Sequence, residues 1–217
     1  MMGCLVSMFI TLEGPEGSGK TTQARLLAAW LRDQGYQVTL TREPGGTDIG
    51  DQIRAVLHDP ENSAIDARTE ILLYSASRAQ HVAQRVRPAL AAGEIVVSDR
   101  YADSTLAYQG YGRGLDLEAL RRITGFATGG LTPDLTLYLD IPAEAGLQRR
   151  QLGGGEWNRL DAESLDFHQR VRAGYLELVK QEPERWAVIH AARSVEEVQA
   201  EIQDVVQGRL NRVKRDT

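Results

Sequence analysis

One glycine-rich segment near the start of the chain constrains the fold more than any other feature. It reads Gly14-Pro15-Glu16-Gly17-Ser18-Gly19-Lys20-Thr21 and matches the pattern G-x-x-x-x-G-K-[ST]. Glycines let the backbone curl so that successive N–H groups point inward at an anion, and the N-terminus of a following helix adds further donors. The segment therefore predicts a phosphate-binding loop between a strand and a helix, in which Lys20 reaches the β- and γ-phosphates and Thr21 suits Mg²⁺.

Short apolar runs alternate with longer amphipathic stretches along the rest of the chain. The runs rich in branched residues predict strands over residues 9–12, 37–41, 95–98, 135–141 and 187–190. The amphipathic stretches predict helices over residues 20–34, 49–57, 66–92 with a bend at Pro88, 116–126, 143–152 and 162–181. Ser194 and Glu197 form a capping-box pattern that opens a last helix. Because strands separated by helices pair in parallel, we expect an α/β fold with a doubly wound, five-stranded parallel sheet flanked by helices.

The chain reads as one domain. Its 217 residues contain no Pro/Ser-rich linker, internal repeat or long charged run, and this length suits a single compact domain with insertions, here residues 1–217. Met8 directly precedes the first strand, so residues 1–7 are a possible N-terminal extension. Residues 149–160, which include Gly153 and Gly155, are expected to form a short lid, and residues 208–217 a flexible, solvated tail.

Composition excludes several classes of protein. The chain carries 25 Lys and Arg against 30 Asp and Glu, a net charge of −5, which argues against nucleic-acid binding through a global basic field. Cys4 is the one cysteine, so an intrachain disulfide and a Cys-rich zinc site are excluded, and a reducing compartment fits. No apolar run approaches the roughly 18 to 20 residues of a membrane span, and the N-terminus lacks a basic n-region, so we expect neither membrane insertion nor secretion.

The residues around the loop narrow the chemistry. A GTPase would need an Asn-Lys-x-Asp segment to read its base, and the chain has none. Many water-activating ATPases place Glu after the acidic residue that ends a strand, whereas here Asp99 is followed by Arg100. Asp99 can hold Mg²⁺ through water, and Arg100 puts a permanent cation where an acid or base would otherwise stand. This arrangement suits phosphoryl transfer to an acceptor that is already ionised, such as a phosphate monoester with a second pKa near 6.

Further motifs follow the loop in a fixed order. They are Thr41-Arg42-Glu43-Pro44-Gly45-Gly46-Thr47, Asp99-Arg100-Tyr101, Ala107-Tyr108-Gln109-Gly110-Tyr111-Gly112-Arg113-Gly114 and Pro133-Asp134-Leu135-Thr136-Leu137-Tyr138-Leu139-Asp140. With the loop, they closely resemble bacterial thymidylate kinases over nearly the whole chain. The resemblance implies a P-loop NTPase fold and a cytoplasmic kinase that transfers the γ-phosphate of ATP to dTMP with Mg²⁺, giving dTDP for dTTP synthesis. It also implies a homodimer that binds neither nucleic acid nor membrane.

The resemblance assigns roles near the phosphates. The ATP-binding residues are those of the loop, Gly14, Pro15, Glu16, Gly17, Ser18, Gly19, Lys20 and Thr21. Lys20 would be catalytic, and Thr21 with Asp99 would hold the metal. Glu16 would accept a hydrogen bond from the 3′-hydroxyl of the acceptor sugar. Arg42 and Arg100 match arginines near the acceptor phosphate, where a planar guanidinium can bind two oxygens, and Arg100 would also be catalytic.

The resemblance also assigns the acceptor's base and sugar. Tyr74 aligns with the aromatic residue that stacks on thymine. Arg78, four residues later on the same helical face, aligns with an arginine that contacts the base. Thr105 and Gln109 stand where the family hydrogen-bonds the base, and Tyr108 where a ring crowds the sugar 2′ position and favours deoxyribose. Ordinary core packing for Tyr74 and a solvated helix face for Arg78 are the structural alternatives.

One departure from the family concerns the cation of the transition state. The variable positions of the loop contain no arginine, so the lid would have to supply the charge, and the candidate catalytic residues are Arg149, Arg150 and Arg159. Close relatives have a denser arginine run and an Asp where this chain has Asn158. Trp157 would either cover the adenine or cap the lid.

Several alternatives stay open at this point. The enzyme could act on another nucleoside monophosphate, or on both dTMP and dUMP, and a nucleotide-dependent switch protein is the alternative from another class. The apolar sides of the helices within residues 66–92 and 116–126 are the expected dimer surface. The histidines are scattered without ligand spacing and are expected to be structural or solvated; they are His58, His81, His168 and His190.

Overall fold

The fold is built on one parallel sheet. The computed structural model describes residues 7–153 and 158–216. Its strands are β1 (Met8–Glu13), β2 (Val38–Arg42), β3 (Ile95–Asp99), β4 (Leu135–Asp140) and β5 (Trp186–His190). They pair in the order β2-β3-β1-β4-β5, and every pair is parallel. The expected five-stranded α/β fold is therefore confirmed.

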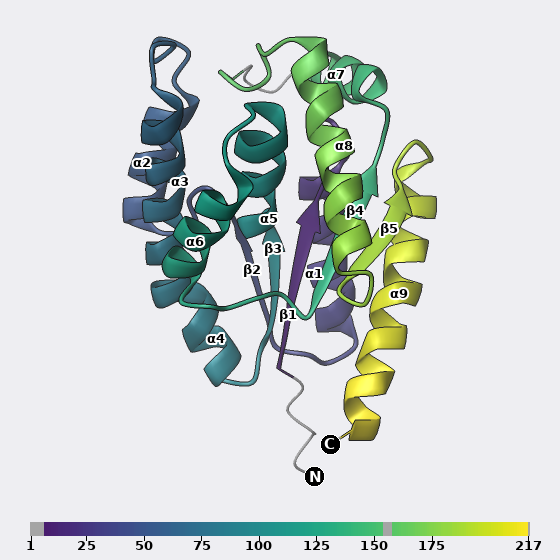
Figure 1. The fold of residues 1–217 in the computed structure, drawn as a ribbon. Coiled ribbons are helices and arrows are strands. Elements are labelled where there is room, and N and C mark those ends of the chain that lie inside the picture. Colours follow the sequence, from purple (N-terminus) through teal and green to yellow (C-terminus); the bar gives the residue numbers. More distant parts are fainter. Residues whose placement is uncertain (1–6, 154–157, 217) are drawn as a thin grey trace.

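Helices cover both faces of the sheet, with α8 in front of it and α1 behind it in Figure 1. In chain order they are α1 (Lys20–Asp33), α2 (Asp48–His58), α3 (Ala67–His81), α4 (Arg87–Ala91), α5 (Ala102–Thr105), α6 (Leu117–Thr128), α7 (Ala143–Leu152), α8 (Leu165–Gln181) and α9 (Val195–Asp216). Two π-helical segments join them, η1 (Val82–Val86) and η2 (Leu106–Gly112). In the part of the chain that the structure describes, no helix is long and apolar enough to cross a membrane.

Strand alternation divides the core into two sides. On one side, Ile10 and Leu137 of the sheet pack with Leu27 of α1 and Ile202 of α9 in an aliphatic cluster. On the other side, Tyr138 of β4 belongs to an aromatic cluster whose further members come from η2, α8 and β5, namely Tyr108, Phe167, Tyr175 and Trp186. Because successive side chains of a strand point to opposite faces, residues 10, 12 and 137 share one side while residue 138 takes the other.

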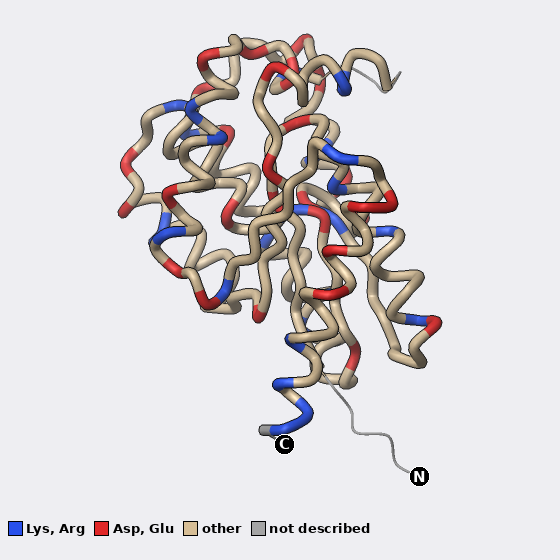
Figure 2. The backbone as a smooth tube through the Cα atoms, turned by 90° about the vertical axis from the view of Figure 1, so that its right-hand side faces the viewer, with Lys and Arg blue, Asp and Glu red and all other residues tan. Residues whose placement is uncertain are grey.

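The register of the central strands positions the site. Leu12 on β1 and Arg42 on β2 both lie opposite Asp99 on β3. The segments that leave these three strands therefore start side by side at one edge of the sheet. The carboxyl edge of a parallel sheet is where ligands bind in such folds. The other end of the molecule holds the end of α9, where Lys214 and Arg215 form the basic patch near the C-terminus in Figure 2.

Three expectations about local structure need correction. The long helix expected over residues 66–92 is interrupted by η1, before Pro88 rather than at it. Pro88 lies in the first turn of α4, a position in which a helix tolerates proline. The segment of α5 and η2 was not expected to be helical. The tail expected to be flexible from residue 208 continues α9 up to Asp216, and Leu210 within it is fully buried. The capping box is confirmed, since Ser194 and Glu197 exchange hydrogen bonds of 3.0 and 3.2 Å.

Candidate active site

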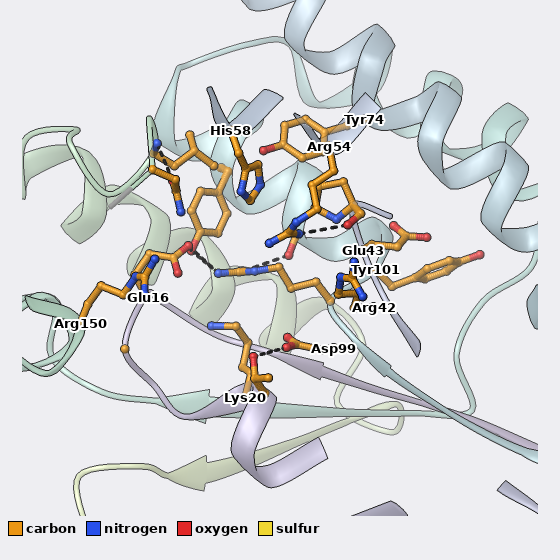
Figure 3. A pocket seen from close by; sticks show the side chains of 18 of the residues that line it. Glu16, Lys20, Arg42, Glu43, Arg54, His58, Tyr74, Asp99, Tyr101 and Arg150 are labelled. Carbon is orange, nitrogen blue, oxygen red and sulfur yellow. Dashed lines mark hydrogen bonds and ion pairs between the residues drawn. The ribbon is translucent and has the colours of Figure 1, made fainter. Parts of the chain in front are cut away.

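A cavity of about 570 Å³ opens at the carboxyl edge of the sheet. Figure 3 shows side chains from the glycine loop, the ends of β2 and β3, and helices α2 and α3 pointing into it. Most of the residues expected to bind ligands line it together; these are Glu16, Gly17, Gly19, Lys20, Thr21, Arg42, Tyr74, Arg78, Asp99, Arg100, Thr105, Tyr108, Gln109, Arg149 and Arg150. Residues up to 144 positions apart in the sequence, Glu16 and Leu160, thus line one cavity.

The glycine loop is shaped by its neighbours. Gly17 has a φ of +68°, and a Cβ built on it would lie 1.9 Å from the carbonyl oxygen of Gly146, so only glycine fits. The Nζ of Lys20 donates to the carbonyl oxygens of Gly14 and Pro15 at 3.0 and 2.7 Å and to the Ser18 hydroxyl at 3.2 Å. Burial and the charge of Arg100 lower the pKa of Lys20 to about 8. The loop therefore holds the lysine inward beside the cavity.

The residues expected to hold a metal meet at the mouth of the loop. The hydroxyl of Thr21, in the first turn of α1, donates to a carboxylate oxygen of Asp99 at 2.5 Å. A hydroxyl and a carboxylate are the oxygen donors that Mg²⁺ takes from P-loop proteins, and phosphates and water complete its shell. No group of three or more His, Cys, Asp and Glu side chains suited to a metal occurs among residues 7–153 and 158–216. The pair thus fits a magnesium ion that arrives with a nucleotide.

Arg100 joins the loop to the acceptor side of the cavity. It directly follows β3 with a φ of +73°, an unusual backbone value that turns its side chain back over the sheet edge. Its guanidinium donates to Glu16 Oε1 at 2.6 Å, to the Tyr108 hydroxyl at 3.0 Å and to the carbonyl oxygen of Gly14 at 3.2 Å. Although burial opposes ionisation, the charges of Arg100 and Lys20 lower the pKa of Glu16 to about 2.

The inner end of the cavity is organised by α3. Tyr74 and Arg78 lie one turn apart, and Arg78 is buried rather than solvated. Its guanidinium donates to Glu43 at 2.8 Å, to the Thr105 hydroxyl at 3.0 Å and to the carbonyl oxygen of Tyr101 at 3.1 Å. Burial opposes the charge on Glu43, but Arg78 and a hydrogen bond from a neighbouring histidine hold its pKa below the usual value. A donor-rich side chain is thus locked beside an aromatic ring, as a flat base with carbonyl groups would require.

A family model described as thymidylate kinase matches residues 12–202 of this chain. The match begins within β1 and covers the glycine loop, strands β2 to β5 and every residue that lines the cavity. The chain belongs to the thymidylate kinase family. The expected family, fold and activity, ATP-dependent phosphorylation of dTMP, are thereby confirmed.

The chain is similar in sequence to individual thymidylate kinases over nearly their full length. The chain is 52% identical to one from Roseiflexus sp. (strain RS-1), covering 97% of this chain and 98% of the relative. It is 50% identical to one from Bacillus pumilus (strain SAFR-032), covering 94% and 97%. The crystal structure of thymidylate kinase from Ehrlichia chaffeensis superposes with a TM-score of 0.77 at 34% identity, covering 93% of this chain and 99% of that one.

Some predicted residues of this thymidylate kinase lie outside the described lining of the cavity. Gly14, Pro15 and Ser18 contact Lys20 instead. Arg159 reaches the carbonyl oxygen of Leu57 and pairs with buried Glu70. Arg159 is therefore not brought together with Arg149 and Arg150, and its catalytic role stays a prediction.

The two remaining lid arginines differ in their partners. Arg149 donates to the carbonyl oxygen of Ala191 at 2.6 Å, whereas Arg150 makes an ion pair with the buried Asp161 at 3.0 Å. Asn158, the departure from the family pattern, accepts from the backbone N–H of Leu160 at 2.8 Å and so caps the turn at the end of the lid. Trp157 and the expectation attached to it lie outside the described residues.

Sequence reasoning missed several residues of the cavity. Arg54 lines the cavity from α2 and donates to the carbonyl oxygen of Pro44 at 3.0 Å. It stands near Arg42, which forms an ion pair with Asp51 at 2.8 Å. His58 lies one turn further, and burial together with the charge of Arg54 lowers its pKa to about 4. The spacing of four between these two residues was the available signal.

Proposed function

We propose that Arg100 is the point at which this kinase brings its two nucleotides together. The observation that carries the proposal is that one guanidinium contacts both the glycine loop, through Gly14 and Glu16, and the acceptor wall, through Tyr108. The acceptor phosphate of dTMP is largely ionised at neutral pH and needs no general base. Catalysis then consists of alignment and charge neutralisation as the γ-phosphoryl group moves from ATP to dTMP.

On the donor side, the loop from Gly14 to Thr21 binds the phosphates of ATP. Lys20 lies beside the cavity, and its positive charge stabilises the negative charge of the γ-phosphoryl group while this group moves toward the acceptor. Thr21 and Asp99 would hold Mg²⁺, which supplies further neutralisation of the phosphate oxygens. Their contact at 2.5 Å supports this assignment, because both oxygens reach one point in front of the loop.

On the acceptor side, three arginines surround the place for the phosphate of dTMP. Arg42, Arg54 and Arg100 line the same cavity from β2, α2 and the end of β3. A planar guanidinium can bind two phosphate oxygens at once, so three of them suffice to hold a dianion against a second polyanion. Glu16 accepts a hydrogen bond from the 3′-hydroxyl of the sugar. Tyr108 donates to the same carboxylate at 2.9 Å, and its ring crowds the 2′ position of the sugar.

The base of dTMP occupies the inner end of the cavity. Tyr74 stacks on the thymine ring, and Arg78, Thr105 and Gln109 face its polar edge. All four side chains are at least nine-tenths buried, so a base that enters is shielded from water. Buried hydrogen-bonding groups of this kind discriminate strongly between bases, because the wrong base leaves them unpaired.

The lid supplies the cation for the transition state through Arg149 or Arg150. Both line the cavity, and Arg149 has no carboxylate partner among the described residues, which leaves its charge uncompensated. A lid cation of this kind is worth about 10³ to 10⁵ in rate. Arg149→Ala, Arg150→Ala and Arg159→Ala should be assayed side by side. The largest fall in kcat identifies the residue, and equal small falls in all three would reject a lid cation.

A homodimer is proposed from the apolar face formed by α2, α3 and α6, which lie together at the left of Figure 1. Exposed apolar side chains gather there; they are Ile49, Val56, Leu72 and Phe126. Phe126 is 91% exposed, and burial of such a ring is a common driving force for association. Light scattering should give twice the chain mass, and a monomer would reject this assembly. We place the enzyme in the cytoplasm, where ATP and dTMP are available.

The acceptor assignment is tested by an ADP-release assay across dTMP, dUMP, dGMP, dAMP, UMP and CMP. Phosphorylation of dTMP should be the fastest, and a better acceptor among the other five would overturn the proposed base contacts. The same assay without any acceptor separates the kinase from a nucleotide-dependent switch. A kinase of this kind hydrolyses little ATP until dTMP is added, whereas a switch protein would turn over ATP alone.

A further inference from the structure

Glu70 lies behind the base pocket and has no assigned role. It stands one turn before Tyr74 on α3, and only 1% of the residue is exposed. Its carboxylate accepts from Gln109 Nε2 at 2.8 Å, from Arg113 at 2.7 and 3.0 Å and from Arg159. Two segments far apart in the sequence, the end of η2 and the lid, thus converge on one buried carboxylate of α3.

The charge on Glu70 is maintained in spite of its burial. Burial opposes ionisation, but hydrogen bonds and charge from Arg113, together with the bonds from Gln109 and Arg159, hold its pKa below the usual value. An ionised carboxylate can only accept hydrogen bonds. The side-chain amide of Gln109 must therefore turn its NH₂ group toward Glu70 and its carbonyl oxygen away from it.

The carbonyl oxygen of Gln109 is left for a ligand. Gln109 lines the cavity, and no hydrogen bond from the described residues reaches its Oε1, which is also not among the fully buried unpartnered atoms. A buried acceptor at the wall of a base pocket gains a partner only when the base presents an N–H group.

We propose that Glu70 is a positioning residue that fixes the amide of Gln109 with its carbonyl oxygen toward the base, and so restricts the pocket to pyrimidines with a protonated N3 and a 4-carbonyl group. The inference rests on the proposed contact between Gln109 and the base. Thymine and uracil carry this edge, whereas cytosine presents a lone pair at N3 and an amino group at C4. Glu70 thereby makes the pocket reject cytosine without touching the nucleotide.

Arg78 explains why the orientation of Gln109 decides specificity. The guanidinium of Arg78 has donors only and is held by Glu43, Thr105 and Tyr101, so it can serve a 4-carbonyl group and cannot adapt to an amino group. Gln109 could adapt, because rotating its amide by half a turn exchanges an acceptor for a donor. The contact with Glu70 removes this freedom, and the two wall residues together read N3–H and C4=O.

The test uses the variant Glu70→Gln. The substitution preserves the shape of the side chain but exchanges the carboxylate, which only accepts hydrogen bonds, for an amide, which can also donate them. Gln109 can then turn, and the ratio of kcat/KM for dTMP over dCMP should fall about tenfold, the order expected for one buried hydrogen bond. The response of dUMP should follow that of dTMP, because the two bases share this edge. The matched control is Glu163→Gln, which removes the other carboxylate on Arg113, 2.9 Å away, and should leave the ratio within about twofold.

The outcomes separate this inference from the proposed function. If Glu70→Gln slows dTMP and dCMP equally, Glu70 is only structural and the inference is overturned. If Gln109→Leu leaves the ratio unchanged, the proposed contact of Gln109 with the base is itself wrong. If Gln109→Leu changes the ratio and Glu70→Gln does not, the base contact stands and the role of Glu70 falls.

A measurement on the unchanged chain covers the case in which Glu70→Gln does not fold. The side-chain ¹H–¹⁵N signals of Gln109 can be assigned by NMR from their loss in Gln109→Leu. If the NH₂ group donates to Glu70, these signals should barely move when dTMP is added. A large shift on adding dTMP would place the NH₂ group against the base and overturn the proposal.

Discussion

The carboxylate of Glu16 and the guanidinium of Arg100 form an ion pair at 2.6 Å, between the glycine loop and the residue that follows β3. Only 17% of the Glu16 side chain and 14% of the Arg100 side chain are exposed, so water screens the pair weakly. Tyr108 donates to the same oxygen of Glu16 at 2.9 Å. The pair ties the donor side of the cavity to the acceptor side, and it explains how an acidic residue can stand within a phosphate-binding loop.

The first prediction concerns the shape of the Arg100 side chain. Arg100→Lys keeps the charge but loses the planar fork that serves Glu16, Tyr108 and the acceptor phosphate together. We expect kcat/KM for dTMP to fall about 10²-fold, with the KM for ATP changed by less than about threefold. Steady-state kinetics with each substrate varied in turn measures both values.

Arg172→Lys is the matched control for Arg100→Lys. Arg172 makes a two-bond pair with Asp140 at 2.8 Å but does not belong to the described lining of the cavity. Arg172→Lys shows how much activity is lost when a planar guanidinium is removed outside the site. The activity of this variant should stay close to that of the unchanged enzyme. A comparable loss of activity in both variants would show that the effect of Arg100→Lys is structural.

The second prediction concerns Lys20. Lys20→Met keeps the length of the side chain but removes a charge that matters most as the γ-phosphoryl group moves. We expect kcat to fall about 10² to 10³-fold, while the KM for dTMP changes by less than about threefold. A variant that keeps the kcat of the unchanged enzyme and loses only affinity for ATP would show that Lys20 binds the ground state and the transition state equally.

The sequence predicted structure best where the conformation depends only on neighbouring residues. The glycine loop and the strands follow from patterns of neighbouring residues, and all of them were predicted within one or two positions. The segment of η2 was missed because Gly110 and Gly112 have low helix propensity. Tertiary packing explains why glycine occupies both positions. A Cβ on Gly110 would lie 2.4 Å from the side chain of Leu117, and a Cβ on Gly112 would lie 2.7 Å from the side chain of Phe167.

The supporting residues of the site were less accessible to sequence reasoning. Glu70 and Gln109 are 39 positions apart, and Glu43 and Arg78 are 35 apart. Nothing in the local pattern around either carboxylate reports its distant partner. The contact of Glu43 exists only after α3 has packed against the end of β2, and that of Glu70 only after α3 has packed against η2. The ligand-facing residues were recognised through resemblance to a family, whereas the residues that orient them required the fold.

The third prediction compares a buried ion pair with an exposed one. Glu43 is 4% exposed and pairs with Arg78, whereas Asp51 is 46% exposed and pairs with Arg42 at the same distance of 2.8 Å. Removing one partner of a buried pair leaves an uncompensated charge, so Glu43→Gln should lower the free energy of unfolding by about 3 kcal/mol. Asp51→Asn should lower it by less than about 1 kcal/mol. Urea unfolding measures both, and equal losses would mean that burial does not distinguish the pairs.

The last prediction concerns acid stability and Glu16. Its pKa is about 2 in the folded chain, below its ordinary value of 4.5. The folded state thus favours the ionised carboxylate, and this contribution is fully present above about pH 4.5 and disappears as the pH falls toward 2. Glu16→Gln lacks the contribution at every pH. The difference in unfolding free energy between the unchanged chain and the variant should therefore shrink by about 1.5 kcal/mol between about pH 6 and about pH 3.5. Urea unfolding at several pH values measures this difference, and a difference independent of pH would show that the pair with Arg100 does not lower the pKa of Glu16.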